Sequence, residues 1–221
     1  MEAVQTYTDF KKGLSYLKQM FFQESLNSSS TDFFEAIIRK NNQQVFIKKV
    51  DLTKDTFNEY ESEVYALTHL NHTNIISPIY VFSDRDNSFV NFQIGYIVLP
   101  YFDGFDLYET LCNYNWKVNP NQLFTFTRNL ISAINHIHEN GFFHRDLKLE
   151  NIVITKPKII HQNSTNEFEF DTNNFKIIDF GSSYNKSINS KNIRFRGSPL
   201  YQPPEYINAG IVTEKFDIWS A

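Results

Sequence analysis

The residues best suited to chemistry lie in one polar run, "HRDLKLEN", at residues 144–151. Within eight positions it carries an imidazole, two cations, two carboxylates and a carboxamide. Such groups can accept a proton, neutralise an anion or bind a hard cation. A second short motif, Asp179-Phe180-Gly181, follows 28 residues after Asn151. The alternative interpretation of the run is an ordinary polar loop before the apolar segment at 152–154.

Two further motifs follow in order, "GSPLYQPPE" at 197–205 and "FDIWSA" at 216–221. The four motifs resemble the catalytic loop, the D-F-G motif, the end of the activation segment and the start of the next helix in protein kinases. Pro203 departs from the pattern, because alanine is usual at that position. From these motifs the chain resembles the protein kinase family over about residues 26–221.

The resemblance implies a role for each polar residue of the site. Asp146 would accept the proton of the substrate hydroxyl, and Lys148 would steady the γ-phosphate of ATP. Asn151 and Asp179 would hold Mg²⁺ through the oxygen ligands that this ion prefers. Ser198 would form a hydrogen bond near Asp146 and Lys148.

The lysine that pairs with the α- and β-phosphates in the family is assigned from "VFIK" at 45–48, which resembles V-A-I-K. This makes Lys48 the phosphate-binding residue and Glu63, 15 residues later, its ion-pair partner. Lys49 is the competing choice, and an ordinary solvated strand lysine is the alternative for either.

The segment "IVLPYFDGFDL" at 97–107 resembles the family's hinge. Leu99 would be the gatekeeper, the backbones of Pro100 and Phe102 would meet the adenine edge, and Asp106 would reach the ribose. Val153, in the strand after the catalytic loop, is also expected at the nucleotide site. A structural turn is the alternative interpretation of this segment.

The glycine-rich loop of the family is missing. Aligned back from Lys48, its three glycine positions fall on Asn27, Ser29 and Asp32, where glycine would let the backbone approach the phosphates. Asp32 would also place a negative charge near them. The valine and alanine that cover the adenine align with Phe34 and Phe46, so two phenyl rings could fill the space that adenine occupies.

The activation segment is also unusual. Arg145 before Asp146 resembles the arginine that pairs with a phosphorylated loop residue in the family. The expected phosphorylation site falls on 193–194, an isoleucine and an arginine, which cannot be phosphorylated. The sequence therefore predicts loop control through an earlier residue, or none. The available hydroxyl residues are Ser182, Ser183, Tyr184, Ser187 and Ser190.

Periodicity predicts the elements that position these residues. Strands are expected at 33–38, 45–50, 76–82, 94–99, 152–154 and 175–178, and helices at 56–70 and 121–139. The fold class is α+β and two-lobed, with a mostly antiparallel N-lobe sheet, one helix on it, and an incomplete helical C-lobe. The expected limits are a helical or irregular lead-in at 1–25, an N-lobe at 26–100 and a C-lobe at 101–221.

Two regions depart from the family's layout. The polar segment 155–174 is expected to be a surface loop between two strands. The chain stops at Ala221, where the family begins the central helix of its large lobe, so the sequence is expected to be a fragment or a truncated product. Apolar surface of the 121–139 helix would then be exposed, Glu205 would lack an arginine partner, and a partner could cover the incomplete lobe.

Three functional hypotheses follow. The first is a serine/threonine kinase, because Lys148 followed by Glu150 resembles that subfamily rather than the tyrosine kinases. It would use ATP and Mg²⁺ and act on a Ser or Thr of a protein substrate. The second is a pseudokinase acting as a binding or allosteric module, which the lost glycines and the two phenylalanines favour. The third is a non-functional truncated product.

Composition narrows the setting. The formal charge of −4 gives no footprint for nucleic acid. Cys112 is the single cysteine, so a reducing compartment is expected. No apolar run approaches the ~20 residues of a membrane span, and the N-terminus lacks the layout of a signal peptide. A soluble, cytoplasmic protein is therefore the expectation.

Overall fold

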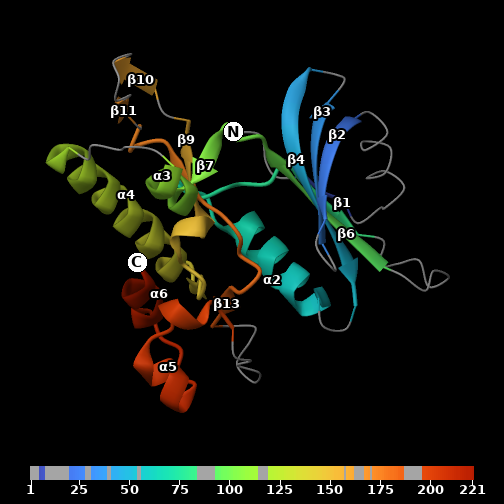
Figure 1. The fold of residues 1–221 in the computed structure, drawn as a ribbon. Helices are drawn as coiled ribbons and strands as arrows, with labels where there is room; N and C mark the ends of the chain where they lie inside the picture. Colours follow the sequence, from blue (N-terminus) through green and yellow to red (C-terminus); the bar gives the residue numbers. More distant parts are fainter. Residues whose placement is uncertain are drawn as a thin grey trace. The chain divides into compact units, whose positions relative to one another are not determined.

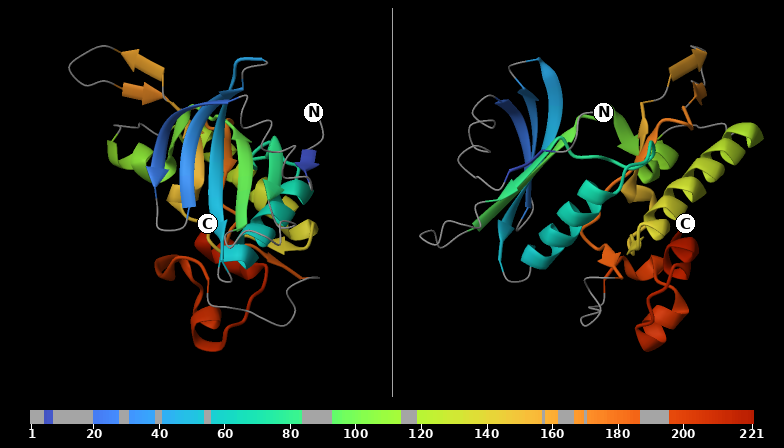
Figure 2. Two further views of the ribbon diagram at one scale, coloured as in Figure 1. Left: turned by 90° about the vertical axis from the view of Figure 1, so that its right-hand side faces the viewer. Right: turned by 180° about the vertical axis from the view of Figure 1, so that it is seen from behind.

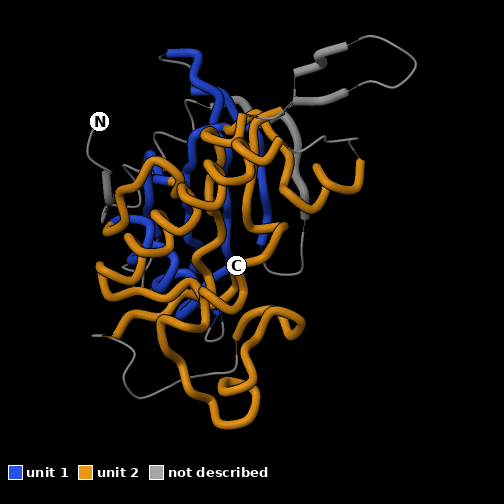
Figure 3. Tube along the Cα trace, turned by 90° about the vertical axis from the view of Figure 1, so that its left-hand side faces the viewer, with its two compact units in different colours: residues 1–68, 77–101 blue, residues 69–76, 102–221 orange. Residues whose placement is uncertain are grey.

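The computed structural model describes residues 5–7, 20–27, 31–38, 41–53, 56–83, 93–113, 119–156, 158–161, 167–169, 171–186 and 196–221. The chain forms two compact units, which Figure 3 shows in blue and orange. Unit 1 comprises Met1–Thr68 and Ser77–Tyr101, and unit 2 comprises His69–Ile76 and Phe102–Ala221. The predicted limit between the lobes lies between residues 100 and 101, whereas residues 69–76 also belong to unit 2.

Unit 1 is built on a six-stranded sheet in the order β1-β5-β6-β4-β3-β2. Its strands are β1 (Gln5–Tyr7), β2 (Met20–Asn27), β3 (Thr31–Ile38), β4 (Gln43–Leu52), β5 (Tyr80–Ser83) and β6 (Gln93–Pro100). All neighbours are antiparallel except β1 and β5, which confirms the predicted sheet. The prediction of a helical or irregular lead-in is wrong where β1 and β2 lie within it.

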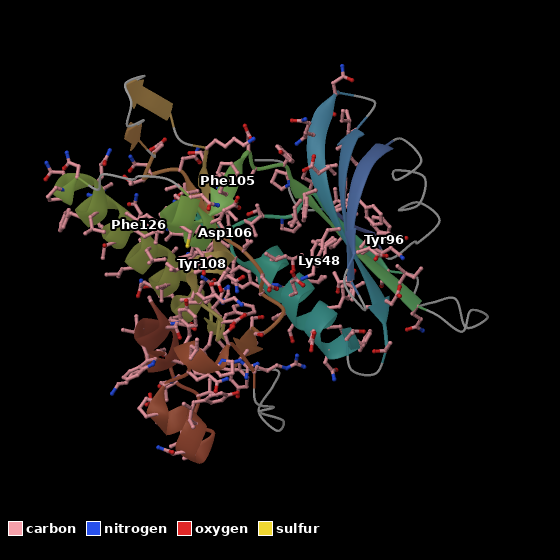
Figure 4. The ribbon with its side chains drawn as sticks, in the orientation of Figure 1. Lys48, Tyr96, Phe105, Asp106, Tyr108 and Phe126 are labelled. Atoms are coloured by element: carbon pink, nitrogen blue, oxygen red, sulfur yellow. The ribbon has the colours of Figure 1, made fainter. Side chains whose placement is uncertain are left out.

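The side chains of β4 point alternately to the two faces of this sheet, with a period of two residues. Val45 and Ile47 are fully buried on one face, where they join the core cluster with Ala36, Ile38, Phe82 and Val98. Phe46 and Lys48 point to the other face, which we call the Lys48 face. Figure 4 shows Lys48 and Tyr96 on opposite sides of the sheet, as expected because Tyr96 is the register partner of Lys49.

Helix α2 (Thr56–His69) lies against one face of the sheet (Figures 1 and 2). Its first turn is held by the side chain of Thr56, which accepts from the backbone of Thr53 and donates to the carbonyl of Asp51. Tyr60, Glu63 and Leu67 recur at helical spacing and are buried. The helix expected from the sequence is therefore present within one residue of its predicted end.

Unit 2 contains the long helix α4 (Pro120–Glu139), drawn in yellow-green in Figure 1. The Asn119 side chain caps it by accepting from the backbone of Asn121, and Pro120 occupies the first turn. It ends at Glu139, with Asn140 as its C-cap, followed by Gly141 in a left-handed conformation (φ 79°). The described residues of this unit also form the helices α3 (Leu107–Asn113), α5 (Pro204–Ala209) and α6 (Lys215–Ser220), with 3-10 turns η1 (Leu149–Asn151) and η2 (Pro199–Tyr201).

Among the described residues of unit 2, three small sheets accompany these helices. Strand β9 (Ile152–Thr155) lies between β7 (Gly104–Asp106) and β12 (Phe175–Ile177). Strand β8 (Phe142–Phe143) pairs with β13 (Tyr184–Asn185). The segment expected to be a loop carries an antiparallel pair, β10 (Lys158–His161) and β11 (Glu167–Glu169), so that prediction is corrected: 155–174 contains a hairpin.

In the described part of the chain, no helix is both long enough and apolar enough to cross a bilayer.

The segment 69–76 joins unit 2 through His72. Its Nε2 lies 3.2 Å from the Ser132 hydroxyl on α4, and its Nδ1 accepts from the backbone of Asn74 at 3.0 Å. The His136 ring lies 5.5 Å away, and the Lys176 ammonium also acts on the imidazole. Burial first, and then these two neighbours, lower the pKa of His72. Its neutral form is therefore the one that the fold favours.

This lowered pKa predicts a loss of stability in mild acid. Between the unfolded pKa near 6.5 and the lower folded pKa, the unfolded chain binds more protons, so the free energy of unfolding falls as pH falls through that window. We expect His72→Gln to flatten the pH dependence of urea midpoints between pH 7.5 and 5.5. Ser132→Ala, which keeps the imidazole, should retain it. Equal slopes for His72→Gln and the unaltered protein would contradict the assignment.

Candidate active site

Unit 1 contains an ion pair between β4 and α2. The Lys48 ammonium donates to both carboxylate oxygens of Glu63, at 3.0 and 2.8 Å. The two side chains retain only 15% and 5% of their accessible surface. A buried carboxylate is costly without a cation, so the pair explains why a glutamate occupies the buried side of α2. The pairing predicted from the sequence spacing is present.

Lys49 lies on the opposite face of the sheet. Its ammonium donates to the Asp32 carboxylate at 2.9 Å and lies 3.9 Å from the Asp51 carboxylate. The hydrogen bond to Asp32 raises the pKa of Lys49. The competing choice of Lys49 as the partner of Glu63 is therefore wrong. The expectation that Asp32 places an unbalanced negative charge near the phosphates is also wrong, because its carboxylate is paired with Lys49.

The register of β3 against β4 corrects the choice of Phe34. Phe34 is the register partner of Ile47 and packs against the core cluster on the face opposite Lys48. Phe33 is the partner of Lys48, and its ring stacks on that of Phe46 with centroids 5.6 Å apart. A shift of one residue moves every side chain to the other face, so Phe33, and not Phe34, lies with Phe46 on the Lys48 face.

The residues aligned with the missing glycines also differ in position from the expected loop. The backbone of Asn27 ends β2 as the register partner of Asp32, which itself lies inside β3. Asp32 is therefore a strand residue and not part of the connection between β2 and β3. Ser29 lies outside the described residues.

The remaining residues expected at the nucleotide fall into both units. Leu99 and Pro100 end β6 in unit 1, opposite Phe46 and Val45. In unit 2, Asp106 accepts from the backbone of Glu109 at 2.7 Å and so caps α3, at the position that Figure 4 labels. Phe102 and Val153 are half-buried, and Val153 is the register partner of Asp106.

In unit 2, a buried carboxylate fixes the start of the catalytic loop. Asp217 on α6 is fully buried. One of its oxygens accepts from the backbone of Arg145 at 2.8 Å, and the other accepts from the backbone of His144 at 2.9 Å and lies 2.8 Å from Nε2 of His138. Arg145 is held with φ 64°, a left-handed conformation that a non-glycine residue adopts at a cost. The carboxylate stabilises this turn.

Four predicted residues meet just beyond that turn. Asn151 donates its side-chain amide to the carbonyl of Asp146 at 2.8 Å and to its carboxylate at 3.2 Å. Lys148 lies 3.7 Å from the same carboxylate and donates to the Ser198 hydroxyl at 3.0 Å. The backbone of Ser198 donates to Asp146 at 2.7 Å. The Asp146 carboxylate is thus oriented from three sides while its side chain keeps 13% of its accessible surface.

Gly197 lets the activation segment approach the catalytic loop. It adopts φ 89°, and a Cβ there would overlap the carbonyl oxygen of Arg145. Only glycine combines this conformation with so close a backbone contact. The approach places Ser198 against Asp146.

Asp179 and Phe180 follow β12. Asp179 has φ 60° and is exposed, and one of its carboxylate oxygens accepts from the backbone of Gly181 at 3.3 Å. Phe180 is fully buried, with its ring 4.6 Å from that of His144. The His144 ring in turn contacts the carbonyl of Ile178 at 3.1 Å. A buried aromatic contact therefore joins the D-F-G motif to the catalytic loop and leaves Asp179 at the surface.

Arg145 is buried beside the activation segment. Its Nε donates to the carbonyl of Ser182 at 2.8 Å, and its guanidinium lies 5.4 Å from the Tyr184 ring. Burial lowers the pKa of Arg145, and its Nη1 has no hydrogen-bond partner among the described residues. Of the hydroxyl residues proposed for loop control, Ser187 and Ser190 lie outside the described part, as do residues 193–194.

Sequence reasoning missed three residues that shape these sites. Asp217 had a signal, because an aspartate inside the apolar hexapeptide "FDIWSA" must find buried donors. Gly197 also had a signal, because it is the first residue of the motif at 197–205. Phe33 had none, because two adjacent phenylalanines give no indication of which faces Lys48.

Comparisons with known proteins point to one family. The family model described as the protein kinase domain matches residues 28–221. Serine/threonine-protein kinase 33 of Mus musculus is 31% identical over 193 residues, covering 85% of this chain and 36% of the relative. Probable serine/threonine-protein kinase 2 of Plasmodium falciparum is 31% identical over 178 residues, covering 80% and 31%. The chain thus spans about a third of the length of these relatives.

A solved structure described as titin kinase and its flanking domains superposes with a TM-score of 0.72. It covers the whole of this chain and 36% of that chain, at 17% sequence identity. At this identity the likeness shows the fold.

Gly197→Ala should be strongly destabilising, by at least about 2 kcal/mol, because it adds a backbone overlap to the cost of a left-handed alanine. Gly210→Ala is the matched control: Gly210 has φ 65°, but a Cβ there meets nothing within 4 Å. It should cost only about 1 kcal/mol. Urea unfolding of both variants measures the difference, and equal losses would show that the contact with Arg145 carries no weight.

Proposed function

The chain belongs to the protein kinase domain family, and we propose that it is a serine/threonine kinase that transfers the γ-phosphoryl group of ATP to a protein hydroxyl. The observation that carries the proposal is the arrangement around Asp146, where a lysine, an asparagine and a backbone amide orient one partly exposed carboxylate. Because the chain spans only part of its relatives, the activity of the whole protein is included in this proposal.

Asp146 is the proposed base. The substrate hydroxyl gives its proton to the Asp146 carboxylate as its oxygen bonds to the γ-phosphorus, and the bond from phosphorus to the bridging oxygen breaks to release ADP. Lys148 lies beside that carboxylate, where its charge can neutralise the transferred phosphoryl oxygens. The hydrogen bond from Lys148 to Ser198 fixes the ammonium in place.

Asn151 and Asp179 fit the donor set that Mg²⁺ requires. The Asn151 amide nitrogen is committed to Asp146, which makes its carbonyl oxygen the atom available to a cation. Asp179 offers a carboxylate at the surface. Mg²⁺ usually takes only one or two carboxylates and completes its shell with water and phosphate oxygens. When bound, the ion would offset the charge of the phosphates.

Lys48 is the proposed partner of the α- and β-phosphates. Glu63 keeps the Lys48 ammonium group in one position through two hydrogen bonds, so little side-chain freedom is lost when a phosphate binds.

A reducing, cytoplasmic setting fits the single Cys112, which is an exposed free thiol.

Mg²⁺ with ATP should raise the melting temperature of the purified protein by about 3–8 °C at saturating nucleotide, because a ligand that binds only the folded state stabilises it. Asp179→Asn should abolish the magnesium-dependent part of the rise. Glu139→Gln, an exposed change at the end of α4, is the matched control. A folded sample with no shift would favour the alternative of a pseudokinase that acts as a binding module.

The stacked pair of Phe33 and Phe46 supports a second prediction. If these rings occupy part of the space for adenine, Phe46→Ala should lower the KM for ATP, by about three- to tenfold for the removed ring. Phe34→Ala removes an equal volume from the opposite face, so it should lower stability and leave this KM unchanged. Steady-state kinetics with casein as the acceptor tests both. A higher KM in Phe46→Ala would show that the ring binds the base instead of blocking it.

A further inference from the structure

Helix α2 is attached to the sheet at a second point besides the Lys48–Glu63 pair. Tyr60 retains 6% of its accessible surface, and its hydroxyl donates to the backbone carbonyl of Phe82 on β5 at 2.9 Å. The carbonyl of Tyr96 on β6 is a more distant acceptor at 3.4 Å. The hydroxyl thus reaches two neighbouring strands from one side chain.

Gly95 on β6 provides the space for the Tyr60 ring. A Cβ on Gly95 would lie 2.5, 2.6 and 2.8 Å from three carbons of that ring, and these are its three nearest neighbours. Glycine inside a strand normally weakens it, and it often marks a close approach by another group. Here the approaching group is Tyr60, so the strand and the helix residue fit one another specifically.

The two attachments are adjacent on the helix and on the sheet. Tyr60 and Glu63 are three residues apart, so they lie on the same side of α2 one turn from each other. Gly95 is the register partner of Val50, and Val50 lies two residues from Lys48 on the same face of β4. A rotation of α2 that released Tyr60 would therefore also move Glu63.

From this arrangement we propose that Tyr60 is a positioning residue that holds α2 where Glu63 reaches Lys48. The inference rests on the proposed kinase function, since it concerns the lysine that would bind the phosphates. The anchor of α2 is thus a residue of the helix itself. Residues of unit 1 then hold Glu63 at the position where it meets Lys48.

The protonation of Tyr60 suits this role. Burial raises the pKa of its phenol well above the ordinary value. The hydroxyl therefore stays a donor over the whole working range of pH, and the contact with Phe82 does not switch with acidity.

Tyr60→Phe tests the proposal, because it keeps the ring against Gly95 and removes only the hydroxyl. With Mg²⁺, ATP and casein, we expect kcat to fall about five- to tenfold, the effect of one lost hydrogen bond on a position that matters only for catalysis. The same substitution in a Glu63→Gln background should change kcat less than about twofold, since a residue that acts through Glu63 has nothing left to position. Equal losses in both backgrounds would overturn the proposal.

Gly95→Ala gives an independent version of the test. The added methyl must displace the Tyr60 ring, so kcat should fall although no polar group is lost. In a Tyr60→Ala background the same change should have no further effect on kcat, because the ring is gone. A loss of the same size in that background would show that Gly95 acts through the strand and would overturn the coupling with Tyr60.

Amide hydrogen exchange of α2 separates this inference from the proposed function. Tyr60→Phe should speed exchange across 60–67 about tenfold, relative to Thr68→Ser as the control, whether or not the protein phosphorylates anything. If the unaltered protein shows no kinase activity but α2 exchange still depends on Tyr60, the proposed function fails and the anchor stands. Unchanged exchange in a folded Tyr60→Phe protein would refute the anchor itself.

Discussion

The buried carboxylate of Asp217 is the constraint on which the geometry of unit 2 depends. It has no exposed surface, and it is balanced by two backbone amides and the His138 imidazole. Those amides belong to His144 and Arg145, so satisfying the carboxylate fixes the turn that presents Asp146. Removing the donors would leave a charge in an apolar interior at a cost of several kcal/mol. The start of the catalytic loop is therefore held by the interior of the unit, in addition to the hydrogen bonds that the loop makes within itself.

Unit 1 solves a comparable problem with side chains. The Glu63 carboxylate is buried on α2 and is balanced by Lys48 on β4, and Tyr60 adds a neutral hydrogen bond one turn away. An ion pair alone tolerates small movements, because Coulomb attraction falls slowly with distance. A hydrogen bond with a ring seated against Gly95 is far more sensitive to position. The ion pair thus attracts α2 to β4, and the Tyr60 contact fixes the position of the helix on the sheet.

Much of this arrangement could be predicted from local patterns. The four motifs and the spacing from Lys48 to Glu63 are encoded in residue types, and the helix at α4 follows from its apolar period and its Asn119-Pro120 start. Most of the failures come from pairing between strands, which the residue types alone do not specify. The register of β3 decided between Phe33 and Phe34, and the strand β2 depends on β3 for its existence. Residues 69–76 join unit 2 through contacts with α4 and β12 that no local pattern indicates.

Three of the hydrogen bonds that Asp146 and Asp217 accept share a chemical feature with a practical result. Their donors at His144, Arg145 and Ser198 are main-chain amides, which every residue except proline possesses. Alanine scanning would leave all three hydrogen bonds in place and would report these positions as tolerant in this respect. Only a proline scan, or replacement of the amide by an ester through chemical ligation, would reveal them. Alanine substitution at the donor positions therefore cannot detect these three hydrogen bonds.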